Sequence, residues 1–91
     1  MSAKVRIPTP LRNLTGGESE VTVEGATLAD VVAALDAKHP GLSERVLDET
    51  GALRRFVNVY VGDEDVRFLD GLATAVHDGA TVSIIPAVAG G

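Results

Sequence analysis

The sequence has no cysteine and few aromatic residues: only Phe56, Tyr60 and Phe68. Without cysteine, the chain is not a disulfide scaffold, a thiolate-metal protein or an enzyme with a cysteine nucleophile. With so few aromatic rings, its core must consist mainly of Val, Leu, Ile and Ala, which supply most of the 45% of hydrophobic residues. Its 91 residues make one domain, and a chain of this size buries about 60–70% of the surface that it exposes when unfolded.

The chain also lacks an excess of basic residues and any long apolar run. Its 13 acidic residues outnumber its 8 Lys and Arg residues, which gives a net charge of −5. A nucleic-acid-binding protein needs a basic face, so we expect no nucleic-acid partner, whereas this charge suits attraction to a basic partner surface. No run approaches the ~20 apolar residues of a membrane span, and there is no signal-peptide core. We therefore expect a cytoplasmic protein that does not contact the membrane.

No group of side chains forms a recognisable active site. His39 and His77 fall on different predicted elements, with no acidic residue at ligand spacing, so we expect no metal site. Asp63-Glu64-Asp65 is an acidic run on a predicted turn, where a solvated loop is more common than a cation site. Gly16-Gly17 lacks the Lys and Ser/Thr that a phosphate loop requires. The sequence therefore predicts a substrate or carrier that enzymes act on, not an enzyme, and it binds no cofactor of its own.

Two alternating segments open the chain. Residues 4–7 and 19–24 each alternate polar and apolar side chains, as half-buried strands do. Residues 8–18 are predicted to form a turn region with the reversal at Gly16-Gly17, because Pro8 and Pro10 limit pairing within a sheet. Together the two strands predict a hairpin with a long loop.

A helix is predicted after Gly25-Ala26. Its apolar residues recur at i, i+3, i+4 and i+7, which gives one buried stripe: Leu28, Val31, Val32 and Leu35. Thr27 stands at the N-cap with Asp30 three residues later, an arrangement that resembles a capping box with a shorter acid. Pro40-Gly41 ends the helix and makes His39 its last residue, because the residue before a proline disfavours helix.

The second half of the chain contains shorter elements. Ser43 is predicted to cap a short helical turn, and residues 48–51 to form a loop. The strongest strand is predicted at residues 56–61, followed by a short edge strand at 65–68 and a last strand at 81–85. In these strands Val57, Val59, Val61, Val82 and Ile84 should face the core, because they share the apolar side of the alternation.

The order of these elements predicts an α+β fold of the β-grasp, or ubiquitin-like, class. One main helix must cover one face of a mixed sheet of four to five strands, with the first and last strands paired side by side as a parallel central pair. We expect this domain to span residues 1–86, to be monomeric when free and to carry a flexible tail at residues 87–91. The uncovered face would carry Phe56, Tyr60 and Ile85, which form either a docking patch or ordinary surface.

The final segment is Pro86-Ala87-Val88-Ala89-Gly90-Gly91. Glycine has no Cβ, so Gly90 and Gly91 can pass close to another backbone in a narrow site, and residues 87–91 can extend about 16–18 Å. A carboxylate must be activated, for instance by adenylation with ATP, before a sulfur or amine nucleophile attacks it. These features favour the α-carboxylate of Gly91 as the working group, although glycines are also common at disordered chain ends.

The chain resembles the sulfur carriers of the MoaD/ThiS family over most of its length. The resemblance rests on the Gly-Gly segment just described and on several internal blocks: Ile7-Pro8-Thr9 with Leu11-Arg12, Ser43-Glu44-Arg45, residues 55–61, residues 63–68 and Gly71-Leu72-Ala73-Thr74. It implies a reacting tail at Gly90 and Gly91 and a segment, Pro86 to Ala89, that threads into partner proteins.

The resemblance also implies a reaction cycle. An activating enzyme related to those of ubiquitin uses ATP and magnesium to adenylate Gly91, and a sulfur donor converts the adenylate to a thiocarboxylate. In one branch of the family, a pyridoxal-phosphate cysteine synthase adds this sulfur to an aminoacrylate made from O-phosphoserine, and a zinc peptidase releases the product. Other branches supply synthases for thiazole, molybdopterin or sulfur-containing natural products such as thiosugars.

Three alternatives to the sulfur carrier remain open at this stage. A protein modifier would form isopeptide bonds through Gly91, as ubiquitin does, and would need the same activation. A non-catalytic subunit would lend its tail to a synthase. An interaction domain would end in two glycines by accident. The nucleophile distinguishes the sulfur carrier from the protein modifier, since it is sulfide for a carrier and a lysine amine for a modifier.

Overall fold

The computed structural model describes residues 2–86, so the predicted tail residues Ala87, Val88, Ala89, Gly90 and Gly91 lie outside the described part of the chain. The strands are β1 (Ser2–Arg6), β2 (Glu20–Glu24), β3 (Val57–Val61), β4 (Glu64–Asp65) and β5 (Ala80–Pro86). The α-helices are α1 (Leu28–Lys38) and α2 (Leu42–Val46), and the 3₁₀ helices are η1 (Thr9–Thr15), η2 (Val66–Phe68) and η3 (Gly71–Ala73).

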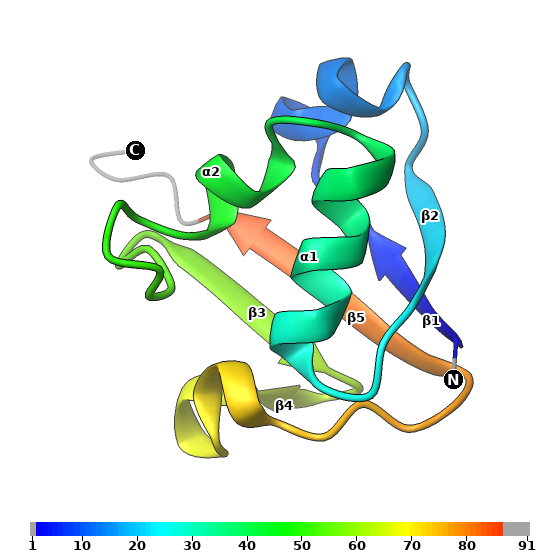
Figure 1. The fold of residues 1–91 in the computed structure, drawn as a ribbon. Coiled ribbons are helices and arrows are strands. Elements are labelled where there is room, and N and C mark those ends of the chain that lie inside the picture. The colour runs from blue at the N-terminus through cyan, green and yellow to red at the C-terminus, as the bar shows by residue number, and fades with distance from the viewer. Residues whose placement is uncertain (1, 87–91) are drawn as a thin grey trace.

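The strands form one mixed sheet in the order β2-β1-β5-β3-β4 (Figure 1). Its central pair, β1 and β5, is parallel, with Val5 opposite Val82, while the other neighbouring strands are antiparallel. The parallel central pair and the mixed sheet with one main helix confirm the predicted β-grasp class. Because β1 and β5 are parallel, their C-terminal ends lie at the same end of the sheet.

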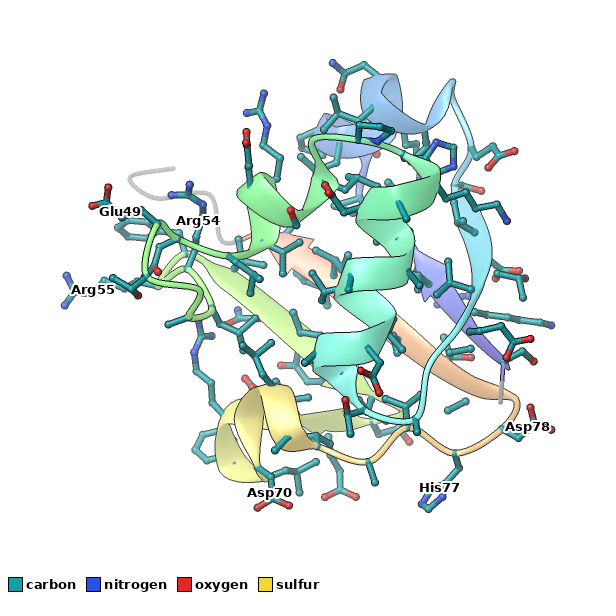
Figure 2. All side chains as sticks on the ribbon, viewed as in Figure 1. Glu49, Arg54, Arg55, Asp70, His77 and Asp78 are labelled. Atoms are coloured by element: carbon teal, nitrogen blue, oxygen red, sulfur yellow. The ribbon has the colours of Figure 1, made fainter. Side chains whose placement is uncertain are left out.

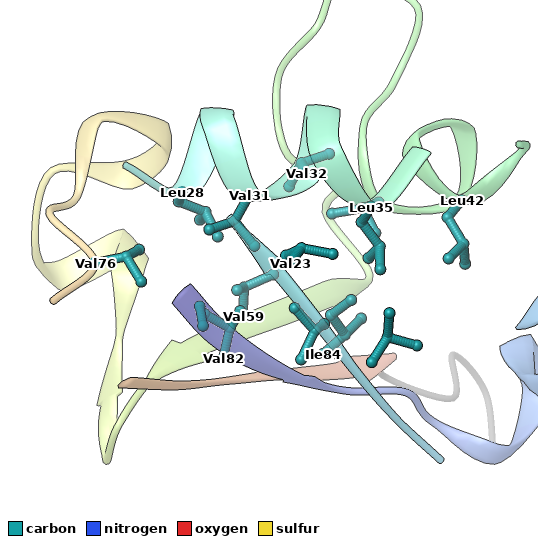
Figure 3. Close-up of a cluster of buried hydrophobic side chains, with 14 of the residues drawn as sticks. Val23, Leu28, Val31, Val32, Leu35, Leu42, Val59, Val76, Val82 and Ile84 are labelled. Carbon is teal, nitrogen blue, oxygen red and sulfur yellow. The ribbon is translucent and has the colours of Figure 1, made fainter. Parts of the chain in front are cut away.

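Helix α1 lies across one face of the sheet, and the core fills the space between them (Figures 1 and 3). The predicted stripe of α1 is buried, as Leu28, Val31, Val32 and Leu35 are at most 4% exposed. From the sheet, inward-facing residues such as Val5, Val59, Val82 and Ile84 meet this stripe. Burial of each such side chain contributes roughly 1.5–3 kcal/mol, so an aliphatic core compensates for the scarcity of aromatic rings.

The start of α1 follows from two local features. Thr27 is the N-cap, and its side-chain oxygen accepts a hydrogen bond from the backbone N–H of Asp30 at 3.3 Å. A Cβ on Gly25 would lie 2.8 Å from the backbone nitrogen of Val31, so only glycine allows β2 to turn this closely into the helix. At the other end His39 is the C-cap, which confirms the predicted helix end within one residue.

The structure corrects several predicted boundaries. Ser43 lies inside α2, whose N-cap is Gly41 with a φ of 103°, because a glycine accepts the left-handed conformation that follows Pro40. The predicted turn region at residues 8–18 contains η1, which begins after Pro8. The predicted edge strand at 65–68 is wrong beyond Asp65, since η2 begins at Val66 and leaves Phe68 87% exposed.

Candidate functional site

The described part of β5 ends at Pro86, where the predicted tail begins. Pro86 is the Cα partner of Val57, the first residue of β3. The pairing between β1 and β5 stops at Ser83, so β5 continues past β1 and is held there by β3 alone. Since Gly90 and Gly91 lie outside the described residues, their role as the reacting tail stays a prediction, and the structure defines the surface at its base.

A hollow of about 380 Å³ lies beside Pro86. Its lining combines apolar and charged side chains from four elements and a turn: Leu11, Glu44, Arg45, Arg54, Val57 and Pro86. A second hollow of about 190 Å³ adjoins it through Arg54 and is lined by Asp48, Arg54, Arg55 and Phe56. The end of β5 therefore opens onto a surface that carries several guanidinium groups.

Arg54 is fixed by hydrogen bonds on both sides. Its backbone N–H donates to the carbonyl of Val46 at 2.9 Å, and its Nε donates to the carbonyl of Glu44 at 2.8 Å. Its own carbonyl accepts from the guanidinium of Arg67, which also donates to Oδ1 of Asn58 at 2.7 Å. These bonds join α2, the segment before β3, β3 and η2 to one another beside the end of β5.

Asp48 shapes the loop beside these arginines. Its Oδ1 accepts hydrogen bonds from the hydroxyl and N–H of Thr50 and from the N–H of Ala52. The Thr50 hydroxyl is the largest of the causes that lower the pKa of Asp48, and the charge of Arg54 is the smallest. The ionised carboxylate therefore holds its own loop and also attracts the neighbouring Arg54.

Charge is unevenly distributed over the molecule (Figure 2). Arg54 and Arg55 lie with Glu49 at the left of this view, Asp70 lies at the bottom, and His77 and Asp78 lie at the lower right. Asp78 accepts hydrogen bonds from the N–H and hydroxyl of Ser2, and the backbone bond is the larger cause that lowers its pKa. The corner near the end of β5 thus carries guanidinium groups and carboxylates side by side.

Of the three residues of the predicted docking patch, two lie in strands. Tyr60 is opposite Ser83, and Ile85 is opposite Asn58, so both lie on the uncovered face of the β3–β5 pair. Phe56 precedes β3 in a turn and lines the second hollow instead. The predicted strand start at Phe56 is therefore one residue early, and the role of the patch as a docking site stays a prediction.

Within residues 2–86, no three His, Cys, Asp or Glu side chains gather in a way that could hold a metal ion. Nε2 of His39 lies 3.6 Å from Oε2 of Glu18, far along the chain from His77. No helix in the described part of the chain is long and apolar enough to span a membrane. The charged surface at the end of β5 is therefore the strongest candidate site in this region.

The fold and the surface at the end of β5 define a small ubiquitin-like protein of the β-grasp class. The model of the ThiS family matches residues 5–91. The chain belongs to the ThiS family, which confirms both the family resemblance and the prediction of a carrier that is not an enzyme.

The similar proteins agree with this assignment. "Sulfur carrier protein CysO" of Mycobacterium tuberculosis is 55% identical over 93 residues, with both chains covered completely. A chain in the crystal structure of the Amycolatopsis orientalis BexX/CysO complex has a TM-score of 0.92 and 49% identity, covering 98% of this chain and 99% of that one. "Small archaeal modifier protein 3" of Haloferax volcanii is 43% identical over 68 residues, which is 75% of this chain and 73% of that protein. The chain thus resembles CysO over its full length, in addition to matching the family model.

Sequence reasoning missed the arginine-lined hollows. The adjacent Arg54 and Arg55 before the strongest strand were the available signal, because they place two of the chain's 8 basic residues side by side. The contribution of Arg45 could not be inferred from spacing, since α2 brings it to Pro86 only through the tertiary fold.

Proposed function

We propose that this chain is a sulfur carrier and that the α-carboxylate of Gly91 holds the sulfur. The observation that carries the proposal is the family match, which runs through residue 91, together with the complete alignment to proteins named sulfur carriers. The base of the tail fits this role because Pro86 is held at the end of the central strand, beside an exposed surface rather than inside the core.

The chemistry proceeds in two steps that take place on a partner. First, a carboxylate oxygen of Gly91 attacks the α-phosphate of ATP, which forms the acyl adenylate and releases pyrophosphate. Then sulfide attacks the acyl carbon, AMP leaves, and a proton is released to give the thiocarboxylate. The activating enzyme supplies the nucleotide and magnesium. The chain contributes a terminus without Cβ atoms, which can enter a narrow site.

For the acceptor, the likeness to CysO favours cysteine synthesis from O-phosphoserine on a pyridoxal-phosphate synthase. An acyl shift would leave cysteine amide-linked to Gly91, and a zinc peptidase would then restore the carboxylate by hydrolysis. The BexX/CysO complex supports a synthase as the partner of a similar chain. It also keeps open an acceptor in another pathway, such as a thiosugar, thiazole or molybdopterin synthase.

Deletion of Gly91 tests the proposal. The variant should fold, because the described core ends at Pro86, and it should accept no sulfur from an activating enzyme, ATP and sulfide. Transfer of sulfur to the deleted variant would overturn the proposed mechanism.

A second function is a protein modifier that forms isopeptide bonds through Gly91. The likeness to a protein named a small archaeal modifier favours this candidate. It predicts Gly91 linked to lysine side chains of other proteins, which peptide mass spectrometry of the cellular proteome would detect.

A further inference from the structure

Two further hollows meet between α1, α2, the loop that follows α2 and η3. One has a volume of about 400 Å³, and most of its lining is apolar: Ala29, Val32, Ala33, Leu47 and Leu72. The other has a volume of about 420 Å³ and shares Ser43, Leu47 and Gly51 with the first. Because of these shared residues, the two hollows form one continuous groove, which we call the helix-side groove.

The walls of the helix-side groove are held by hydrogen bonds. On one side, Oδ1 of Asp36 accepts from the N–H of Ser43 at 3.1 Å, which ties α1 to α2. On the other side, the N–H of Asp48 donates to the carbonyl of Ala52 at 2.8 Å, which closes the loop after α2. Ordered walls lower the entropy cost of binding, because little of the groove has to be immobilised when a partner enters.

The floor of the groove can enclose an apolar side chain. Ala29 and Ala33 are exposed and lie four residues apart, so they are neighbours on one face of α1. Their small side chains leave a channel beside Leu47 and Leu72, which are half-buried. Burial of apolar surface contributes about 25 cal/mol per Å², so the channel favours a partner that inserts an apolar side chain.

The rim of the groove is mainly anionic. Of the charged residues that line the two hollows, all but the last are acidic: Asp36, Glu44, Asp48, Glu49 and Arg54. The N–H of Ser43 is the largest cause that lowers the pKa of Asp36, and the Thr50 hydroxyl is the largest that lowers the pKa of Asp48, so both are ionised near neutral pH. Nε of Arg54 already donates to the carbonyl of Glu44. The excess of carboxylates therefore attracts a cationic partner.

We propose that the helix-side groove binds a basic amphipathic segment of a partner protein. An apolar side chain of this segment fills the channel beside Ala33, and its lysine or arginine side chains lie along the acidic rim. The groove lies on the helix side of the sheet, so a partner bound there leaves the uncovered face accessible (Figure 1). The inference goes beyond the proposed function, because no residue of β5 lines the groove.

The test uses the full chain, labelled with ¹⁵N, and designed helical peptides as probes. The first peptide carries leucine at i, i+3, i+4 and i+7 and lysine at the other positions, so that it has one apolar stripe. A second peptide has glutamate in place of lysine. A third has the composition of the lysine peptide in an order that breaks the stripe. Titration followed by NMR gives the Kd and the residues that each peptide contacts.

Two pairs of matched variants separate the groove from general effects. Ala33→Phe fills the channel and is compared with Ala37→Phe, at an exposed position of α1 outside the lining. Glu49→Lys reverses a charge of the rim and is compared with Glu64→Lys on β4. Circular dichroism should show the same fold for all four variants.

The lysine peptide should shift the amide resonances of Ala33, Leu47 and Leu72, and its Kd should be about tenfold or more below that of the peptide without the stripe. The glutamate peptide should not bind. Ala33→Phe and Glu49→Lys should each raise the Kd of the lysine peptide about fivefold or more, whereas the controls stay within about twofold. Added salt should also raise this Kd, because it screens the charges of the rim.

Absence of binding, equal affinity for the two lysine-containing peptides, or equal effects of the groove variants and their controls would overturn this proposal. If sedimentation shows a dimer that Ala33→Phe dissociates, the groove joins two copies of this chain and the proposal is wrong. Deletion of Gly91 should leave the Kd of the lysine peptide unchanged, so failure of this inference and failure of the proposed function are distinguishable.

Discussion

Pro86 and Val57 are Cα partners at the end of the antiparallel β5–β3 pair. Proline has no N–H to donate, so it cannot extend this ladder as a donor. The N–H of Val57 donates to the carbonyl of Arg54 at 3.1 Å, which ties the start of β3 to the turn before it. The base of the predicted tail is therefore positioned by β3 and this turn, whereas β1 stops pairing at Ser83.

Arg67→Ala should loosen this support. The guanidinium of Arg67 joins Asn58 to the carbonyl of Arg54, and its loss should cost about 1 kcal/mol of unfolding free energy because the site is exposed. Arg67→Lys should not restore this stability, since a single ammonium cannot bridge two acceptors in a fixed fork. Urea unfolding measures both variants, and faster amide hydrogen exchange at Val57 would locate the effect. Full stability in Arg67→Lys would contradict the bridging role.

Gly90→Val should leave the unfolding midpoint unchanged and abolish adenylation. The described core ends before this position, and a β-branched side chain restricts the backbone and widens a segment that must enter a narrow site. Thermal denaturation and pyrophosphate exchange measure the two effects separately. Normal exchange by this variant would mean that the partner site is wider than the account requires.

Asp36 should make stability depend on pH. Its Oδ1 accepts from the N–H groups of Ser43 at 3.1 Å and Gly41 at 3.0 Å, so it joins α1 to α2. The bond from the Ser43 N–H is the largest cause that lowers the pKa of Asp36. A lowered folded pKa gives stability that is present above the unfolded value of about 3.9 and is lost as pH falls through the folded value.

Asp36→Asn keeps an acceptor oxygen and removes the charge. Its stability deficit relative to the unmodified chain should be largest near neutral pH and should shrink below about pH 4, where the carboxylate of the unmodified chain becomes protonated. Urea unfolding across this range gives the comparison. A stability deficit that stays constant with pH would show that the negative charge of Asp36 adds no stability beyond that of its hydrogen-bond geometry.

Thr27→Ala should destabilise the protein by about 1 kcal/mol, because the N–H of Asp30 loses its side-chain acceptor at the start of α1. Thr27→Ser keeps the hydroxyl and serves as the matched control, with most of the stability retained. Chemical denaturation distinguishes the two. Equal losses in both variants would point to the methyl group rather than to the cap.

Much of this fold could be predicted because its patterns are local. The stripe from Leu28 to Leu35 and the alternation around Val82 follow directly from helix and strand periods. The element boundaries that were predicted wrongly depend on backbone conformation and tertiary contacts. Gly41 displaced Ser43 as the cap because its φ is positive, and Phe68 sits on a 3₁₀ turn although its residue type favours a strand. The grouping of Arg45 with Pro86 needs the tertiary fold, so no spacing in the sequence could indicate it.

The most direct test of the account is mass spectrometry of the C-terminal peptide. The chain would be produced with an activating enzyme, ATP and a sulfide source, and treated with iodoacetamide before digestion. Because the sequence has no cysteine, rapid alkylation reports a thiocarboxylate. The change must be located in the peptide that contains Gly91, since oxidation of Met1 adds nearly the same mass as exchange of oxygen for sulfur. A sulfur carrier should give an alkylated peptide ending at Gly91, whereas an unmodified terminus under conditions that support adenylation would contradict the proposed function.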